Sequence, residues 1–152
     1  MGVRTFNGLD ELGAAVGEQL GQSDWHEITQ AQVNLFAEAT GDHQWIHVDP
    51  ERAKDGPFGQ TIAHGYLTLS LLPVLVAEIY RVDGVSMGLN YGTNKVRFPA
   101  PVPVGSKVRA SAQLVELTPI AIGTQAVVRV TIEIEGGSKP ACVADVAWVY
   151  VQ

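Results

Sequence analysis

Alternation of apolar and polar residues dominates the chain from residue 86 onward. Within 128–134 every second residue is valine or isoleucine, and within 107–114 small or branched apolar residues alternate with charged or polar ones. A period of two is typical of strands with one buried face, and 141–151 supplies a last strand. Turn signals separate these strands at 101–105, 119–123 and 136–137. The second half is therefore predicted to be an antiparallel meander.

The first half has the spacing of helices and loops. Leu12, Val16 and Leu20 lie four residues apart, which predicts a short helix over 10–20 with Gly21 as its C-cap.

A second helix is predicted to begin after Thr29, a good N-cap residue, and to end at Gly41, which suits a left-handed C-cap. Asp49 followed by Pro50 marks the start of another helix. The intervening segment, 42–48, is therefore predicted to be a loop held between two helices.

The run 64–80 is apolar nearly all round, and a helix of this kind must be covered by other structure. Pro73 is expected to kink or break it. One buried helix followed by long antiparallel strands predicts an α+β layout, in which a curved sheet wraps around the helix. We expect a single domain over 1–152, with an N-terminal helical extension over about 1–22.

Composition and charge indicate which classes of partner the protein is not expected to bind. The 152 residues are 46% hydrophobic and 17% charged, and the net charge is −6 with scattered basic residues, so neither nucleic acid nor an anionic membrane is expected to bind. No secretory signal and no apolar run of about 20 residues is visible. The single cysteine, Cys142, excludes an internal disulfide and is expected to be a buried strand residue. These features predict a cytoplasmic protein.

Two acids and two histidines fall within 40–49. Asp42 and His47 can converge on one water molecule, because imidazole titrates near neutrality and a carboxylate accepts hydrogen bonds. The alternative is structural: Asp42 would cap a turn and His47 would pack. His43, His47 and the acids Asp42 and Asp49 also carry metal-binding atoms, but there is little room for the continuous helix that would align them. We therefore expect no metal.

Gly65 and His64 begin the apolar helix. A helix N-terminus offers unpaired N–H groups to an oxygen that gains negative charge, and glycine lets a ligand approach the backbone closely. Helix packing against the sheet is the alternative role for Gly65, and His64 could be structural.

Lys95 and Arg97 share one face of a predicted strand in the segment 90–99, which also contains Asn90. The two cations could receive the phosphates of a coenzyme A tail. Solvated cations at a strand edge are the alternative. The sequence has no G-x-S-x-G elbow, no phosphate-binding loop and no dinucleotide fingerprint, so those chemistries find no support.

Three motifs, in order along the chain, resemble those of the MaoC-like dehydratases, the (R)-specific enoyl-CoA hydratases of the hot-dog superfamily. The family's hydratase motif, approximately G-D-x-N-P-[IVL]-H-x-[DE], is similar to 41–49. Its A-H-G element is similar to 63–67, and its R-F-x-x-P-V element to 97–102. The similarity covers nearly the whole chain from about Ser23. The departure is Gln44-Trp45, where the family usually has Asn-Pro.

This resemblance implies a hot-dog fold in which Asp42 and His47 are the catalytic pair and the Gly65 amide contributes to an oxyanion hole. Residues expected to orient the substrate or line its acyl tunnel are Gln44, Trp45, His64 and Asn90.

The reaction implied is hydration of a trans-2-enoyl-CoA to an (R)-3-hydroxyacyl-CoA, and the reverse dehydration. No cofactor is expected, because the coenzyme A thioester is the substrate, and an acyl carrier protein is an alternative carrier. Hot-dog sheets pair, so a homodimer is expected. The rival functions are an acyl-CoA thioesterase and a non-catalytic acyl-thioester binding protein.

Overall fold

The computed structural model describes residues 2–152. The strands are β1 Arg4–Asn7, β2 Gln19–Gln22, β3 His26–Glu27, β4 Tyr80–Asp83, β5 Met87–Arg97, β6 Lys107–Ile120, β7 Gly123–Ile134 and β8 Cys142–Val151. The helices are α1 Leu9–Gly13, α2 Gln30–Thr40, α3 Trp45–Val48, α4 Pro50–Ala53, α5 Gly65–Ser70 and α6 Leu72–Ala77.

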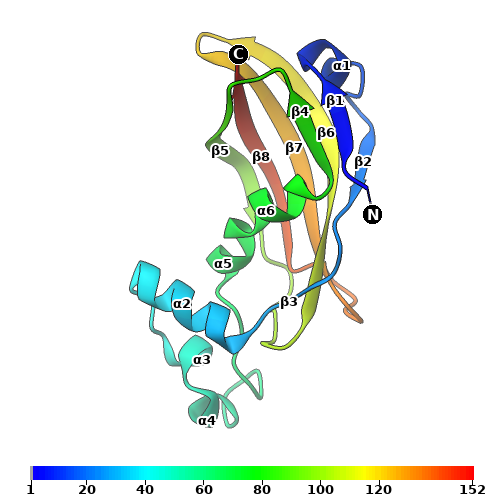
Figure 1. The fold of residues 1–152 in the computed structure, drawn as a ribbon. Coiled ribbons are helices and arrows are strands. Elements are labelled where there is room, and N and C mark those ends of the chain that lie inside the picture. Colours follow the sequence, from blue (N-terminus) through cyan, green and yellow to red (C-terminus); the bar gives the residue numbers. More distant parts are fainter. Residues whose placement is uncertain (1) are drawn as a thin grey trace.

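The main sheet has the strand order β2-β6-β7-β8-β5, with β3 also paired to β6 (Figure 1). The long strands β6, β7 and β8 pair antiparallel with their neighbours, which confirms the predicted meander. Their alternating apolar residues form the core: Val108, Ala110, Ala112 and Leu114 of β6 are buried, as are Val128, Val130 and Ile132 of β7. The predicted α+β layout, with a curved sheet around central helical structure, is confirmed.

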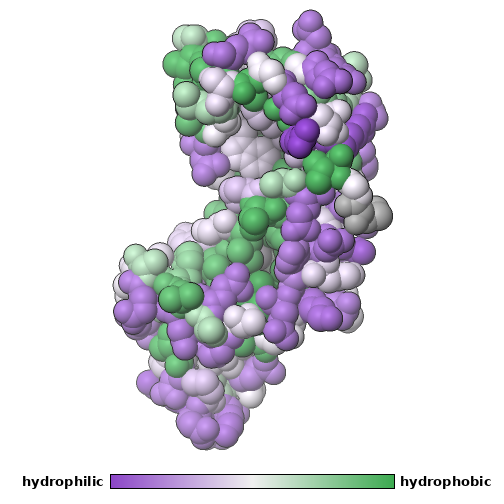
Figure 2. Space-filling view, in the orientation of Figure 1, coloured by the Kyte–Doolittle hydropathy of each residue, from purple (hydrophilic) through white to green (hydrophobic). Residues whose placement is uncertain are grey.

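The central apolar run forms two short helices, α5 and α6, instead of one. The break falls at Leu71, and Pro73 lies in the first turn of α6, where its missing N–H costs least. This confirms the break expected from Pro73. The expectation that the run is covered on all sides is wrong for this chain alone, because Tyr66 is 70% and Val74 59% exposed. Figure 2 shows apolar side chains at the surface over these helices.

The predicted helix over 10–20 is wrong beyond Gly13. The chain turns at Gly17, whose φ is 92°, and then enters β2, which pairs antiparallel with β6. Gly21 is therefore not a helix cap but a strand residue beside a bulge. The N-terminal segment thus contains two strands besides the short helix α1, and β1 pairs in parallel with β4, a pairing that the sequence pattern did not predict.

Helix α2 has the caps that the sequence predicts. The Thr29 hydroxyl accepts a hydrogen bond from the Gln32 amide, and Gly41 is left-handed with φ 82°. Asp49 caps α4 by accepting from the Arg52 amide. The predicted loop 42–48 contains one turn of helix, α3, so that part of the prediction is wrong. Helices α2, α3 and α4 project from the end of the sheet where α5 begins (Figure 1).

Within residues 2–152, none of the helices has both the length and the apolar character needed to cross a membrane.

Candidate active site

Asp42, His47 and His64 lie together, although they come from the turn after α2, from α3 and from the residue before α5. A carboxylate oxygen of Asp42 and one ring nitrogen of each histidine lie within 4.8 Å of one another. Asp42 is exposed, whereas His47 and His64 are only 7% and 3% exposed. The structure therefore joins the predicted segment 40–49 and His64, which was predicted at the start of the apolar helix, into one polar site with one open side.

The imidazole of His47 has a defined tautomer. Its Nδ1 lies 2.7 Å from the carbonyl oxygen of Ile62, and since a carbonyl only accepts, Nδ1 must carry the proton. The lone pair is then on Nε2. The pKa of His47 is lowered from 6.5, chiefly because burial disfavours the charged ring, and the neighbouring His64 lowers it further. The hydrogen bond to Ile62 and the nearby Asp42 act in the opposite direction and raise the pKa. At neutral pH, Nε2 is thus available to accept a proton.

His64 packs directly against His47. The two imidazoles are stacked, with centroids 3.9 Å apart, and the Phe36 ring contacts the His64 ring at 4.8 Å. The Nε2–H of His64 donates to the backbone carbonyl of Asp42 at 3.0 Å. Its Nδ1 is buried and has no hydrogen-bond partner within residues 2–152. His64 therefore ties the Asp42 turn to the start of α5.

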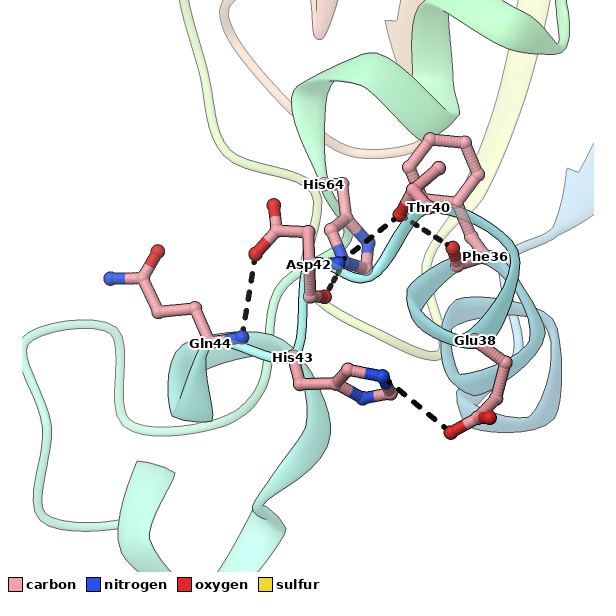
Figure 3. Close-up of polar contacts among 7 residues, drawn as sticks. All are labelled: Phe36, Glu38, Thr40, Asp42, His43, Gln44 and His64. Atoms are coloured by element: carbon pink, nitrogen blue, oxygen red, sulfur yellow. Dashed lines mark hydrogen bonds and ion pairs between the residues drawn. The ribbon is translucent and has the colours of Figure 1, made fainter.

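The Asp42 turn is held by its own backbone and by α2 (Figure 3). The Asp42 amide donates to the Thr40 hydroxyl at 3.4 Å, and that hydroxyl donates to the Phe36 carbonyl at 2.7 Å. The Asp42 carboxylate accepts from the Gln44 amide at 3.4 Å. The Gln44 side chain itself points away from Asp42 in Figure 3.

The metal-binding set considered from the sequence is not assembled. His43 points toward Glu38, with 3.6 Å between its Nε2 and a Glu38 carboxylate oxygen (Figure 3), and Asp49 caps α4. The residues that could hold a metal ion are instead Asp42, His47 and His64. Their geometry suits this poorly, because the lone pairs of the two stacked rings lie in separate planes only 24° apart, whereas metal ligands must converge on one point.

Gly65 begins α5 beneath an aromatic side chain. A Cβ at this position would lie 3.3 Å from the Phe98 ring, and Phe98 in turn makes an edge contact with Tyr66 at 6.1 Å. Within the described residues the Gly65 N–H has no hydrogen-bond acceptor. The helix start thus presents a free donor next to His64, where the sequence placed it.

The Trp45 ring contacts other residues of the segment that contains α3 and α4. The Arg52 guanidinium lies 4.4 Å from the Trp45 ring centroid, and a Cβ on Gly56 would come within 2.9 Å of that ring. These contacts pack the α3–α4 segment.

Asn90 lies in a cavity of about 360 Å³ between α5–α6 and strands β5 and β8. Its side-chain oxygen accepts from the Trp148 indole N–H at 2.9 Å. Leu69 and Ser70, at the C-terminal end of α5, line the same cavity.

Lys95 and Arg97 share one face of β5, as the sequence predicts, and that face is opposite to the helices, because Val96 between them packs against the core. They line a shallow cavity of about 310 Å³ with Arg129, Val143 and Asp145. Arg129 is already paired with Asp145 through two hydrogen bonds, of 2.8 and 3.1 Å.

A family model described as a MaoC-like domain matches residues 11–136. The chain belongs to the MaoC-like dehydratase family. Among curated relatives, 3-hydroxyacyl-thioester dehydratase Z of Mycobacterium tuberculosis is 62% identical over 150 residues, which cover 98% of this chain and 99% of the relative. Nodulation protein N of Rhizobium leguminosarum bv. viciae is 43% identical, over 94% of this chain and 89% of the relative.

Among solved MaoC-like structures, an (R)-hydratase from A. caviae involved in PHA biosynthesis superposes with a TM-score of 0.72 at 25% identity, covering 88% of this chain and 95% of that one. The hot-dog fold implied by the motifs is thereby confirmed. The segment that carries Asp42 and His47 lies within the matched residues 11–136.

Proposed function

We propose that this MaoC-like protein adds water to the double bond of a trans-2-enoyl thioester, giving an (R)-3-hydroxyacyl thioester, and catalyses the reverse dehydration. The observation that carries the proposal is the fixed tautomer of His47, whose Nδ1–H is committed to the Ile62 carbonyl. Its Nε2 therefore holds the lone pair of a neutral ring, and a ring nitrogen of His47 lies within 4.8 Å of an Asp42 carboxylate oxygen. The name of the 62%-identical relative, a 3-hydroxyacyl-thioester dehydratase, supports the substrate class.

In the hydration direction, one water is held between the Asp42 carboxylate and His47 Nε2. The water oxygen bonds to C3 while His47 Nε2 takes one of its protons, and the C2–C3 π electrons move toward the thioester carbonyl. The imidazolium then returns that proton to C2 on the same face. Atoms and charge balance, because His47 ends neutral and Asp42 only orients the water.

The Gly65 amide stabilises the enolate-like oxygen in this proposal. Its N–H has no acceptor within the described chain, and a donor already in place stabilises developing charge without reorganisation. His64, and Gln44 through its backbone amide, help to orient Asp42, and Trp45 shapes the loop that carries the site.

The acyl chain enters the cavity beside Asn90, and the carrier is coenzyme A or an acyl carrier protein. Lys95 and Arg97 would receive phosphates of the carrier. No cofactor takes part, since the thioester is the substrate. We place the reaction in the cytoplasm, where the free Cys142 would remain reduced.

A homodimer is part of the proposal. Strand β5 forms one edge of the main sheet, and its apolar residues Met87, Leu89 and Tyr91 are exposed. An open strand edge with apolar side chains favours pairing with a second copy. Light scattering of the purified protein should give twice the monomer mass, and a monomer would contradict this part.

The test of function is incubation with crotonyl-CoA, following loss of the enoyl absorbance while free thiol is titrated in parallel. Absorbance loss without thiol, with an (R)-3-hydroxy product, supports the hydratase. Thiol release would identify a thioesterase. Binding without turnover of short or long enoyl chains would identify a binding protein.

A further inference from the structure

His47 is held from two directions by groups outside the hydratase motif. Its ring donates to the Ile62 carbonyl at 2.7 Å, and its own backbone carbonyl accepts from the Gln30 side chain at 2.8 Å. The Ile62 amide also donates to the Ile46 carbonyl at 3.0 Å. The segments 46–47 and 61–62 are thus joined through both backbone and side chain.

The Gln30 amide group is fully engaged at the start of α2. Its Nε2 donates to His47 and to Asn34 Oδ1 at 3.0 Å, and its Oε1 accepts from the Thr61 hydroxyl at 2.7 Å. One side chain therefore links the backbone of His47 to the residue that precedes Ile62.

Thr61 is a firm anchor for this link. It is buried, and its carbonyl accepts from the Val104 amide at 3.0 Å, while the Ala63 amide donates to the Val102 carbonyl at 2.8 Å. The segment that carries the acceptor for His47 is in this way paired with the loop after β5.

These contacts close a ring: from the His47 imidazole to the Ile62 carbonyl, along the chain to Thr61, through its hydroxyl to Gln30, and back to the His47 carbonyl. We propose that Gln30 and Thr61 are positioning residues that fix the side-chain orientation and tautomer of His47, and so aim Nε2 at the reacting water. This inference rests on the proposed function for its kinetic consequences but not for its structural ones.

The His47 ring needs such positioning because a proton is transferred only over a short distance. The Nδ1–H tautomer persists only while the Ile62 carbonyl stays in the ring plane, because the partner of one ring nitrogen sets the state of the other. A shift of about 1 Å in a catalytic group can cost about a hundredfold in rate. Loss of either side chain removes the Gln30–Thr61 hydrogen bond, so that only the backbone hydrogen bonds of 61–63 still hold the Ile62 carbonyl against the His47 ring.

The experiment compares two disruptive variants with two matched controls. Thr61→Val removes the hydroxyl and keeps the shape, and Thr61→Ser keeps the hydroxyl. Gln30→Met removes all three polar contacts of this side chain at a half-buried position, so it tests the positioning role even where Thr61→Val fails to fold. Asn34→Ala removes the other partner of Gln30 and leaves the ring of contacts intact.

We expect kcat for crotonyl-CoA hydration to fall by about tenfold to a hundredfold in Thr61→Val and Gln30→Met, with KM changed less than about twofold. Thr61→Ser should recover most of kcat, and Asn34→Ala should match the wild type. Imidazole ¹⁵N spectra without substrate should show His47 as the Nδ1–H tautomer in the wild type and a mixture in the two disruptive variants.

Folded Thr61→Val and Gln30→Met proteins that keep the wild-type kcat would overturn the proposal. A lower kcat with an unchanged His47 tautomer would overturn it too, because the loss would then arise elsewhere. If the wild type hydrates no enoyl thioester, the proposed function fails, and the ¹⁵N spectra still test whether Gln30 and Thr61 fix the tautomer of His47.

Discussion

The imidazole rings of His47 and His64 are stacked, with 24° between their planes and 3.9 Å between their centroids. Protonating His47 would place a charge in a buried site against a second titratable ring. Burial is the larger cause of its lowered pKa; the Ile62 hydrogen bond acts in the opposite direction, His64 lowers the pKa further, and Asp42 raises it. The stack thus helps to keep His47 neutral.

The pH dependence of hydration should show this lowered pKa. Neutral His47 is the active form, so kcat/KM should stay level as pH falls from about 8 to 6.5 and decline only below that value. The same group binds protons more readily in the unfolded chain, so its contribution to stability is present above about pH 6.5 and is lost as pH falls. Initial rates across this range test the sign: an acid limb centred above 6.5 would contradict it.

His47→Gln should lower kcat by about 10²- to 10⁴-fold, the range typical of acid–base groups. Asp42→Asn removes the charge that orients the water and should lower kcat by about a hundredfold. Both substitutions keep side-chain size, and Asp42 is exposed, so circular dichroism and the melting temperature should change little for Asp42→Asn. If both folded variants hydrate crotonyl-CoA at near-normal rates, the assigned pair is wrong.

Local signals explain what the sequence could predict. Thr29, Gly41 and Pro73 act on the backbone within one or two turns of themselves, so the bounds of α2 and the break before α6 could be inferred without tertiary information. The alternation in β6 and β7 is likewise local.

The sequence-based predictions were wrong where contacts with distant segments determine the local structure. Leu12 and Leu20 are both buried, as a helix would bury them, but residues 19–22 instead pair with the edge of β6, and Arg4 pairs with Tyr80. No local pattern distinguishes these outcomes.

Gln30 was missed as a site residue for a similar reason. A glutamine in the first turn of a helix is normally solvated, and its partners His47 and Thr61 are 17 and 31 residues away. The only sequence signal was the position of Gln30 directly after the N-cap, which is common to many helices.

Gly65→Ala should lower kcat/KM by roughly tenfold, although alanine keeps the backbone N–H. The added methyl group would lie 3.3 Å from the Phe98 ring, so either Phe98 or the start of α5 must shift. Gly13→Ala is a matched control in another short helix, because its Cβ would meet Leu117 at an ordinary 3.6 Å. Equal losses in the two variants would indicate a general effect of the methyl group on the fold.

Cys142 should be chemically inert in the folded protein. It is buried in β8, and burial raises the pKa of its thiol to about 11, so little thiolate exists near neutral pH. Iodoacetamide should modify it only after denaturation, and Cys142→Ala should hydrate crotonyl-CoA normally. Rapid alkylation of the native protein would show that the strand opens.

The roles of Lys95 and Arg97 can be separated from their effect on the fold by changing the substrate. In the double variant Lys95→Glu/Arg97→Glu, KM for crotonyl-CoA should rise by about two- to fivefold per charge with kcat unchanged, and added salt should reduce the difference. The N-acetylcysteamine thioester of crotonate carries no phosphate, so its kinetics should not change. If both substrates respond equally, the substitutions perturb β5 itself. If neither responds, the two cations serve as solvated charges that protect the edge strand, and the carrier phosphates bind elsewhere.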